Sequence, residues 1–141
     1  MRSSSAILFA FLIPLASADA SDGDILKRFG MLGNLAVDCA APHAYGNPHF
    51  TISLSPQGTI TYTILQGRSR ESRTMRNLRL LTPELLQYES DGTVTIAKIE
   101  GKFRIWRFVG TDGTIYVENG KTTRITPHEN EPTHTLMACG N

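Results

Sequence analysis

The segment from His49 to Leu65, HFTISLSPQGTITYTIL, predicts an antiparallel β-hairpin and decides the fold class. Apolar and polar residues alternate on both sides of Pro56-Gln57-Gly58, with the period of two that marks a half-buried strand. A three-residue loop with proline first and glycine at the left-handed third position suits a type I turn with a bulge. This loop places Leu54 opposite Ile60 and keeps the other apolar residues in step, so one face of the hairpin is apolar.

Further turns follow along the chain, each made of one residue and a glycine. They lie at Gln66-Gly67, Asp91-Gly92, Glu100-Gly101, Asp112-Gly113 and Asn119-Gly120. The segments between them are rich in Thr, Ile, Val, Phe and Tyr, as in a succession of hairpins. Strands are predicted near 34–38, 49–55, 59–65, 72–81, 84–89, 93–99, 102–110, 114–118, 121–125 and 134–139.

The fold class is therefore all-β, with eight to ten antiparallel strands and one short N-terminal helix. After Ser21-Asp22, which suit a helix N-terminus, Ile25, Leu26 and Phe29 recur at helical spacing. Sequential strands joined by short turns favour a meander that closes into a small barrel, because closure removes the exposed strand edges. A two-sheet β-sandwich is the alternative.

Two-residue loops, predicted at Glu100-Gly101, Asp112-Gly113 and Asn119-Gly120, divide the later side chains between two faces. The predicted core side carries Val94, Ile96, Phe103, Ile105, Val109, Tyr116 and Ile125. The other side carries Thr93, Thr95, Lys102, Arg104, Trp106, Phe108 and Val117. The second face is less polar than a solvated one. Its large residues are therefore either covered by the N-terminal helix or a C-terminal segment, or form a patch for a partner.

The N-terminus has the three parts of a secretory signal peptide. Arg2 precedes an apolar run from Ala6 to Ala16, and Ala16-Ser17-Ala18 is a small-residue cleavage site. The run is shorter than the ~20 residues that span a bilayer, so we expect no transmembrane anchor after cleavage. We therefore divide the chain into a signal peptide, residues 1–18, and one barrel-like domain, residues 19–141, which is periplasmic or secreted.

The charge of the mature chain is balanced. Removing residues 1–18 takes away one of the 14 basic side chains, which leaves 13 basic and 13 acidic ones and a net charge of zero. A nucleic-acid partner would require an excess of basic side chains, so we expect none.

The mature chain contains two cysteines, Cys39 and Cys139. In an oxidising compartment an even pair predicts a disulfide. A disulfide that closes so long a loop lowers the entropy of the unfolded chain, which stabilises the folded protein by ~4 to 5 kcal/mol. Two free buried thiols are the alternative.

Two resemblances extend this interpretation. A short helix, then GNLAVDC from Gly33 to Cys39, then a meander resembles the lipocalin-like (calycin) pattern, with Leu35 in place of the tryptophan of that pattern. This resemblance implies binding of a small, partly apolar molecule in the barrel mouth. The stretch from Gly30 to Pro48 is also similar to small exported proteins of Gram-negative bacteria that are described as uncharacterised, and that similarity implies no activity.

Catalytic and metal chemistry find no support in the residue patterns. The spacing of the histidines matches no zinc signature, so we expect no metal site. They are His43, His49, His128 and His134. The sequence has no Gly-x-Ser-x-Gly, no His-Glu-x-x-His, no glycine-rich phosphate loop and no carboxylate pair spaced for acid–base work. We expect a binding protein without a cofactor rather than an enzyme.

One charged pair falls on the predicted core side, where Arg107 lies opposite Glu118, with Tyr116 beside them and Lys98 near the strand end. The pair either lies at the rim of the barrel with its charged groups in water, or lines a pocket for an anionic or amphipathic ligand.

The segment from Arg68 to Arg79 holds five arginines and one glutamate. Alternation along a strand sends Arg73 and Arg79 to one face and Arg76 to the other, so the arginines form no continuous surface. We interpret residues 67–72 as a solvated hairpin loop that leads into an edge-like strand. A patch that binds an anionic group is the alternative.

These observations predict an exported, non-enzymatic binding domain. Its partner is a small apolar or anionic ligand in the barrel mouth, near Arg107, Glu118, Tyr116 and Lys98. The alternative is a protein-partner module, such as an inhibitor of an envelope or foreign enzyme. Its surface would be formed by Trp106, Phe108, Arg73, Arg76 and Arg79.

Overall fold

The computed structural model describes residues 20–124 and 127–140, so the predicted signal peptide and Ile125 lie outside the described residues. One helix, α1 (Asp22–Phe29), precedes the strands. The strands are β1 (Gly33–Ala36), β2 (His49–Leu54), β3 (Ile60–Gln66), β4 (Ser69–Thr82), β5 (Leu85–Ser90), β6 (Thr93–Ile99), β7 (Phe103–Val109), β8 (Ile115–Glu118), β9 (Lys121–Thr122) and β10 (Thr135–Cys139). Among these residues no helix is long and apolar enough to cross a membrane.

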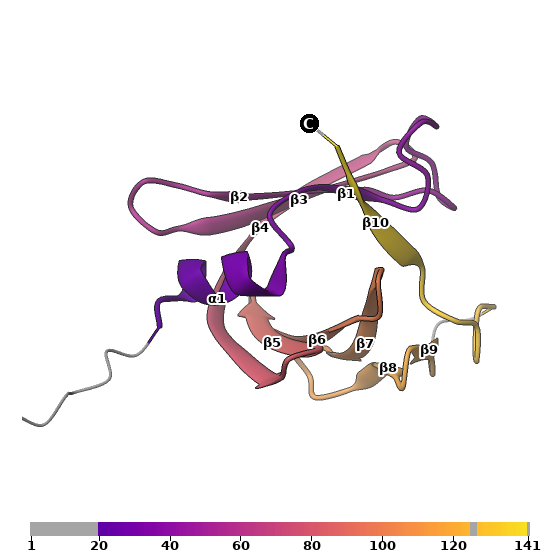
Figure 1. Ribbon diagram of the computed structural model, residues 1–141. Helices are drawn as coiled ribbons and strands as arrows, with labels where there is room; N and C mark the ends of the chain where they lie inside the picture. Colours follow the sequence, from indigo (N-terminus) through magenta and orange to yellow (C-terminus); the bar gives the residue numbers. More distant parts are fainter. Residues whose placement is uncertain (1–19, 125–126, 141) are drawn as a thin grey trace, which may run out of the picture.

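The strands form an antiparallel meander that closes on itself (Figure 1). Strand β10 pairs with β1 along one edge and with the start of β7 along the other, at Leu136 and Phe103. Strands β1–β7 and β10 therefore make a closed eight-stranded barrel, while β8 and β9 extend the sheet from the end of β7. The predicted barrel is confirmed, and the two-sheet sandwich is wrong.

The hairpin of β2 and β3 has the register that the sequence predicts. Leu54 pairs with Ile60 and Ile52 with Tyr62. Gly58 takes the left-handed conformation with φ 84°, as the turn requires. Ile52 and Ile60 are buried in the core, so the apolar face of this hairpin lines the barrel.

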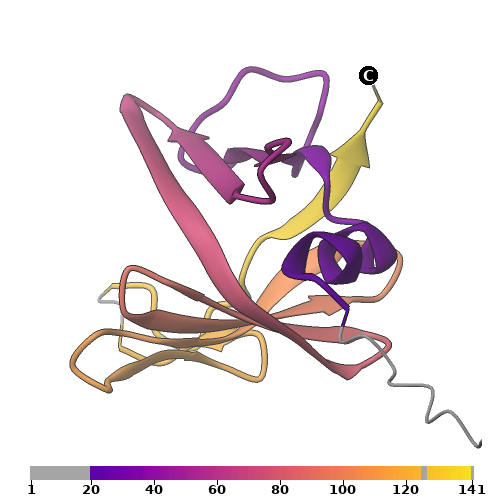
Figure 2. The same cartoon turned by 90° about the vertical axis from the view of Figure 1, so that its left-hand side faces the viewer.

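Helix α1 closes one end of the barrel between the β1–β4 and β5–β7 parts of its wall (Figure 2). The side chain of Ser21 caps the helix by accepting a hydrogen bond from the Asp24 backbone N–H, 3.2 Å away. Leu26 and Phe29 are buried, and the Phe29 ring lies 5.9 Å from that of Phe103 on β7. These contacts make the helix part of the core at this end.

Strand β4 links the two parts of the wall. It begins at Ser69, directly after a tight turn, so the predicted loop over residues 67–72 is too long. Its first half pairs with β3, and its second half, from Arg76, pairs with β5. The direction changes at Asn77, which has φ 53° and donates a side-chain hydrogen bond to Glu89 Oε2 at 2.9 Å.

The faces of the later strands differ from the prediction. On β6 the buried residues are Thr93, Thr95 and Ala97, so Val94 and Ile96 point outward and not to the core. The predicted two-residue loop at Glu100-Gly101 is wrong, because Ile99 pairs with Phe103 across three residues, which reverses the faces of β6. On β7 the faces change at a bulge. Arg107 pairs with Ile96 and Ile105 pairs with Ala97, so Trp106 between them has no partner on β6. This extra residue sends Arg107 and Val109 outward and turns Phe108 inward. A second bulge opposite β7 lies at Tyr116.

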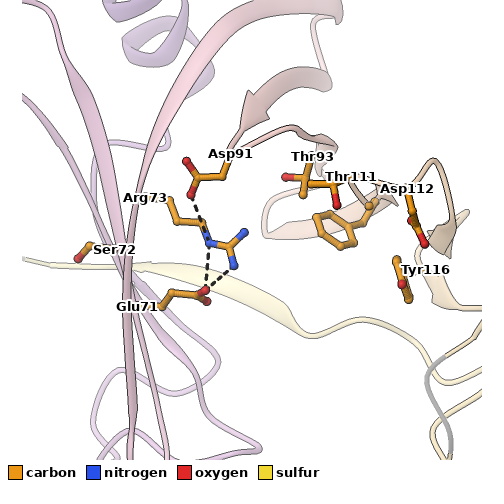
Figure 3. A pocket seen from close by; sticks show the side chains of 10 residues that line it. Glu71, Ser72, Arg73, Asp91, Thr93, Thr111, Asp112 and Tyr116 are labelled. Atoms are coloured by element: carbon orange, nitrogen blue, oxygen red, sulfur yellow. Dashed lines mark hydrogen bonds and ion pairs between the residues drawn. The ribbon is translucent and has the colours of Figure 1, made fainter.

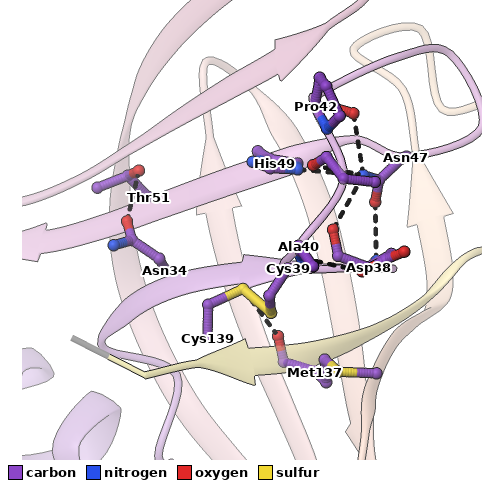
Figure 4. The surroundings of a disulfide bond; sticks show 11 residues. Asn34, Asp38, Cys39, Ala40, Pro42, Asn47, His49, Thr51, Met137 and Cys139 are labelled. Atoms are coloured by element: carbon purple, nitrogen blue, oxygen red, sulfur yellow. Dashed lines mark hydrogen bonds between the residues drawn. A yellow bond between two sulfur atoms is a disulfide. The ribbon is translucent and has the colours of Figure 1, made fainter.

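The predicted disulfide is confirmed. Cys39 and Cys139 are bonded, with their Cα atoms 5.5 Å apart, and tie the chain after β1 to the end of β10 (Figure 4). Asn47 organises the loop that follows. Its Oδ1 accepts from the Asp38 backbone N–H at 2.8 Å, and its Nδ2 donates to the Asp38 carbonyl at 3.0 Å.

Candidate functional site

The end of the barrel opposite α1 holds a cavity of about 570 Å³, here called the mouth cavity (Figure 3). Strand β4 and the turns that follow β5 and β7 form its wall. The lining residues are Glu71, Ser72, Arg73, Asp91, Thr93, Phe108, Gly110, Thr111, Asp112 and Tyr116. Its volume lies in the range of about 300–1,000 Å³ that small-molecule sites occupy.

The interior changes from apolar to polar toward this cavity. The inward residues along β4, β5 and β6, taken from the α1 end to the mouth, are Met75, Arg73 and Glu71, then Leu86, Tyr88 and Ser90, then Ile99, Ala97, Thr95 and Thr93. A barrel stabilised only by its core would bury apolar side chains along its whole length. The mouth half of the interior therefore holds polar side chains that the stability of the fold does not require.

Arg73 is held inside the mouth cavity by two carboxylates. Its Nε donates to Glu71 Oε1 at 3.1 Å, a second guanidinium nitrogen donates to the same oxygen, and Asp91 Oδ2 lies 3.9 Å from Nε. The hydrogen bond to Glu71 raises the pKa of Arg73 further above its ordinary value, so this side chain is permanently charged. With Asp112, the lining carries three carboxylates and one guanidinium, a formal charge of −2.

Asp112 is fixed at the rim by the turn between β7 and β8. Its carboxylate accepts hydrogen bonds from the backbone N–H of Thr114 at 2.9 Å and from the Thr114 hydroxyl at 2.8 Å. The backbone hydrogen bond is the main cause that lowers the pKa of Asp112 below its usual value. Asp112 therefore stays ionised at neutral pH.

An aromatic pair lies beside Asp112, across the cavity from Arg73 and Glu71 (Figure 3). The rings of Phe108 and Tyr116 lie 6.1 Å apart with an interplanar angle of 42°. Tyr116 packs so closely on Gly110 that a Cβ at that position would lie 2.7 Å from Tyr116 Cε2. A glycine is therefore needed there to admit the tyrosine ring.

Buried polar groups separate the mouth cavity from the apolar core. The Thr93 hydroxyl donates to the Ser90 carbonyl at 2.6 Å, and Tyr62 donates its phenol hydrogen to Ser90 Oγ at 3.4 Å. The ring of Tyr88 lies 6.3 Å from that of Tyr62, and burial raises the pKa of the Tyr88 phenol, which stays neutral.

The residues predicted to bind a ligand do not share one site. Tyr116 lines the mouth cavity, but Arg107 and Glu118 lie on the outer face, paired at 3.3 Å with side chains 42% and 41% exposed. The two facing atoms are shielded from water, while the rest of both side chains is solvated. Lys98 also points outward. Its Nζ lies 2.5 Å from Glu100 Oε1 and 4.2 Å from the centre of the Trp106 ring.

The predicted partner surface is divided as well. Phe108 and Arg73 line the mouth cavity, whereas Trp106 packs on the outer face against Lys98. Arg76 and Arg79 are exposed on the second half of β4.

The carboxylates of the mouth cavity are not among the site residues that the sequence predicts, although two of them, Asp91 and Asp112, lie in predicted turns. In a meander, alternate turns lie at the same end of the barrel. The turns at Asp91-Gly92 and Asp112-Gly113 are separated by one other turn, which was enough to bring them together.

The histidines lie outside the mouth cavity. The rings of His43 and His49 are 6.1 Å apart, and His128 Nδ1 lies 3.0 Å from Glu131 Oε2. Across residues 20–124 and 127–140, no three His, Cys, Asp or Glu side chains come together as a potential metal site.

Comparison with known proteins adds no relative, since no family model, curated protein or solved structure matches the chain.

Proposed function

We propose that the protein is an exported, non-enzymatic binding domain that takes a small ligand in the open mouth of its barrel. The observation that carries this proposal is the polar and aromatic cavity of about 570 Å³ at the end that α1 leaves open. A few charged groups around an aromatic wall are typical of small-molecule sites. The disulfide supports export, because such bonds persist in oxidising compartments.

The protonation states of the cavity favour binding over catalysis. A general acid needs a raised pKa at neutral pH, whereas the pKa of Asp112 is lowered. Glu71 is engaged by Arg73 through two hydrogen bonds to one carboxylate oxygen. Charges fixed by hydrogen bonds in this way are suited to orienting a ligand.

Native mass spectrometry of the protein, purified gently from the envelope of its own host, tests this proposal. We expect the wild type to retain a bound mass, and the double substitution Phe108→Ser, Tyr116→Ser to lose it because the aromatic wall is gone. Trp106→Ala, on the outer face, is the matched control and should keep the ligand. Retention of the same mass by the mouth variant would place the ligand elsewhere and contradict the proposal.

A further inference from the structure

We infer that the ligand of the mouth cavity is a small organic cation, with an ammonium or guanidinium group on an apolar body. This inference rests on the proposed function and names its ligand class. It replaces the apolar or anionic ligand expected from the sequence, because three features of the lining favour a positive charge.

The first feature is the charge balance. Arg73 is the single cation among the lining residues, and its guanidinium already donates two hydrogen bonds to Glu71. Asp91, whose side chain is 65% exposed, lies only at the edge of this pair, and Asp112 stays ionised at the rim. An anion entering the cavity would meet three carboxylates, and Arg73, the one cation of the lining, is already paired; Arg124, outside the lining, acts on Asp112 from the rim.

The second feature is the aromatic wall of Phe108 and Tyr116. A cation within about 6 Å of an aromatic ring centre is attracted by the negative face of the ring. The apolar part of the same ligand would cover the rest of both rings. Carboxylates and aromatic rings, both present in this lining, are the two partners that an alkylammonium or guanidinium group uses.

The third feature is the Thr93 hydroxyl. Thr93 lines the cavity and is more than nine-tenths buried, with 7% of its surface exposed. Its hydrogen is donated to the Ser90 carbonyl, and within the described residues the hydroxyl oxygen accepts no hydrogen bond. The Thr93 hydroxyl oxygen can therefore still accept a hydrogen bond from an N–H group of a ligand.

Three probes with the same aromatic body test the charge directly. They are 4-phenylbutylamine, 4-phenylbutanol and 4-phenylbutyrate, which are cationic, neutral and anionic at neutral pH. Titration followed by calorimetry and by NMR shifts should show the amine binding at least about tenfold more tightly than the acid. The shifts should map to Thr93, Phe108 and Tyr116. Raising the salt from about 0.01 M to about 1 M, which shortens the Debye length from about 30 Å to about 3 Å, should weaken the amine alone.

Asp91→Asn is a variant that removes charge from the cavity without disturbing the fold. Asp91 has φ 47° and precedes a glycine in a two-residue turn, where Asn-Gly is a preferred sequence. We expect it to weaken the amine by about two- to fivefold, the range of a partly exposed ion pair, and to leave the alcohol unchanged. Glu100→Gln makes the same charge change at the other end of the barrel and should affect neither probe.

The outcomes separate this inference from the proposed function. If the alcohol or the acid binds in the cavity as tightly as the amine, the cation is wrong but a ligand-binding mouth remains. If none of the three probes shifts the cavity residues, both ideas are overturned. A short lysine peptide that binds there while the free amine does not would show that the cation belongs to a polypeptide, which overturns the small-molecule part.

Discussion

Replacing Gly110 by alanine tests how the aromatic wall of the mouth is built. The new Cβ would lie 2.7 Å from Tyr116 Cε2 and 3.1 Å from Asp112 Oδ1, so the tyrosine ring must move. Gly46→Ala is the matched control, because a Cβ there meets nothing within 4 Å. Neither glycine has a positive φ, so the backbone accepts alanine at both positions.

The difference between these two variants isolates the contact with Tyr116. Each substitution stabilises the protein by about 0.4–1 kcal/mol through the unfolded chain. Overpacking at Gly110 costs about 1–3 kcal/mol, so Gly110→Ala should be less stable than Gly46→Ala by that amount. Urea unfolding measures the difference, and the displaced ring should also weaken binding of 4-phenylbutylamine. Equal stability and equal affinity in both variants would refute the proposed packing.

Other predictions follow from the disulfide, the outer ion pair and the mouth carboxylate. The double substitution Cys39→Ser, Cys139→Ser opens a loop with a sequence separation of 100 residues and should lower the free energy of unfolding by about 4–5 kcal/mol in urea; a loss below about 1 kcal/mol would contradict this. Glu118→Gln should cost at most about 1 kcal/mol, since both side chains are more than one-third exposed although their facing atoms are shielded, and a loss of several kcal/mol would mean a buried pair. The lowered pKa of Asp112 contributes stability that is present above its unfolded pKa, near 3.8, and is lost as the pH falls through the lower folded value. Acid titrations of Asp112→Asn should therefore show a shallower fall in stability below pH ~4, and a slope identical to that of the wild type would argue against the hydrogen bonds to Thr114.

The fold was largely predictable because local signals agreed with one another. Proline and glycine fixed the loop at residues 56–58, and the register that follows places Ile52 and Ile60 in the core. The helix could be recognised from its cap and its apolar spacing. Closure through β10 could be expected because a meander with free edges is unfavourable.

The faces of β6 and β7 could not be predicted, because the apolar pattern there points the wrong way. Val94 and Ile96 are more apolar than Thr93 and Thr95, yet the threonines face inward at the polar end of the barrel. The bulge at Trp106 then reverses which side chains of β7 point inward, and no residue type near Trp106 predicts a bulge.

The same error misplaced the candidate site. The pairing of Arg107 with Glu118 was predicted correctly, but the side on which the pair lies depends on the bulge. The sequence did not indicate that Phe108 points inward. It therefore gave no reason to choose the carboxylates of the mouth cavity, and not the outer pair, as the candidate site.

The position of β10 has a consequence for how the chain folds. Every other strand precedes it in the sequence, yet it pairs with the first strand and with the seventh. During synthesis the barrel therefore cannot close, and Cys139 cannot reach Cys39, until β10 has emerged. Until then β1 and β7 expose unpaired edges, and contacts so distant in sequence form slowly. We therefore expect the nascent chain to depend on chaperones that shield strand edges until β10 has docked.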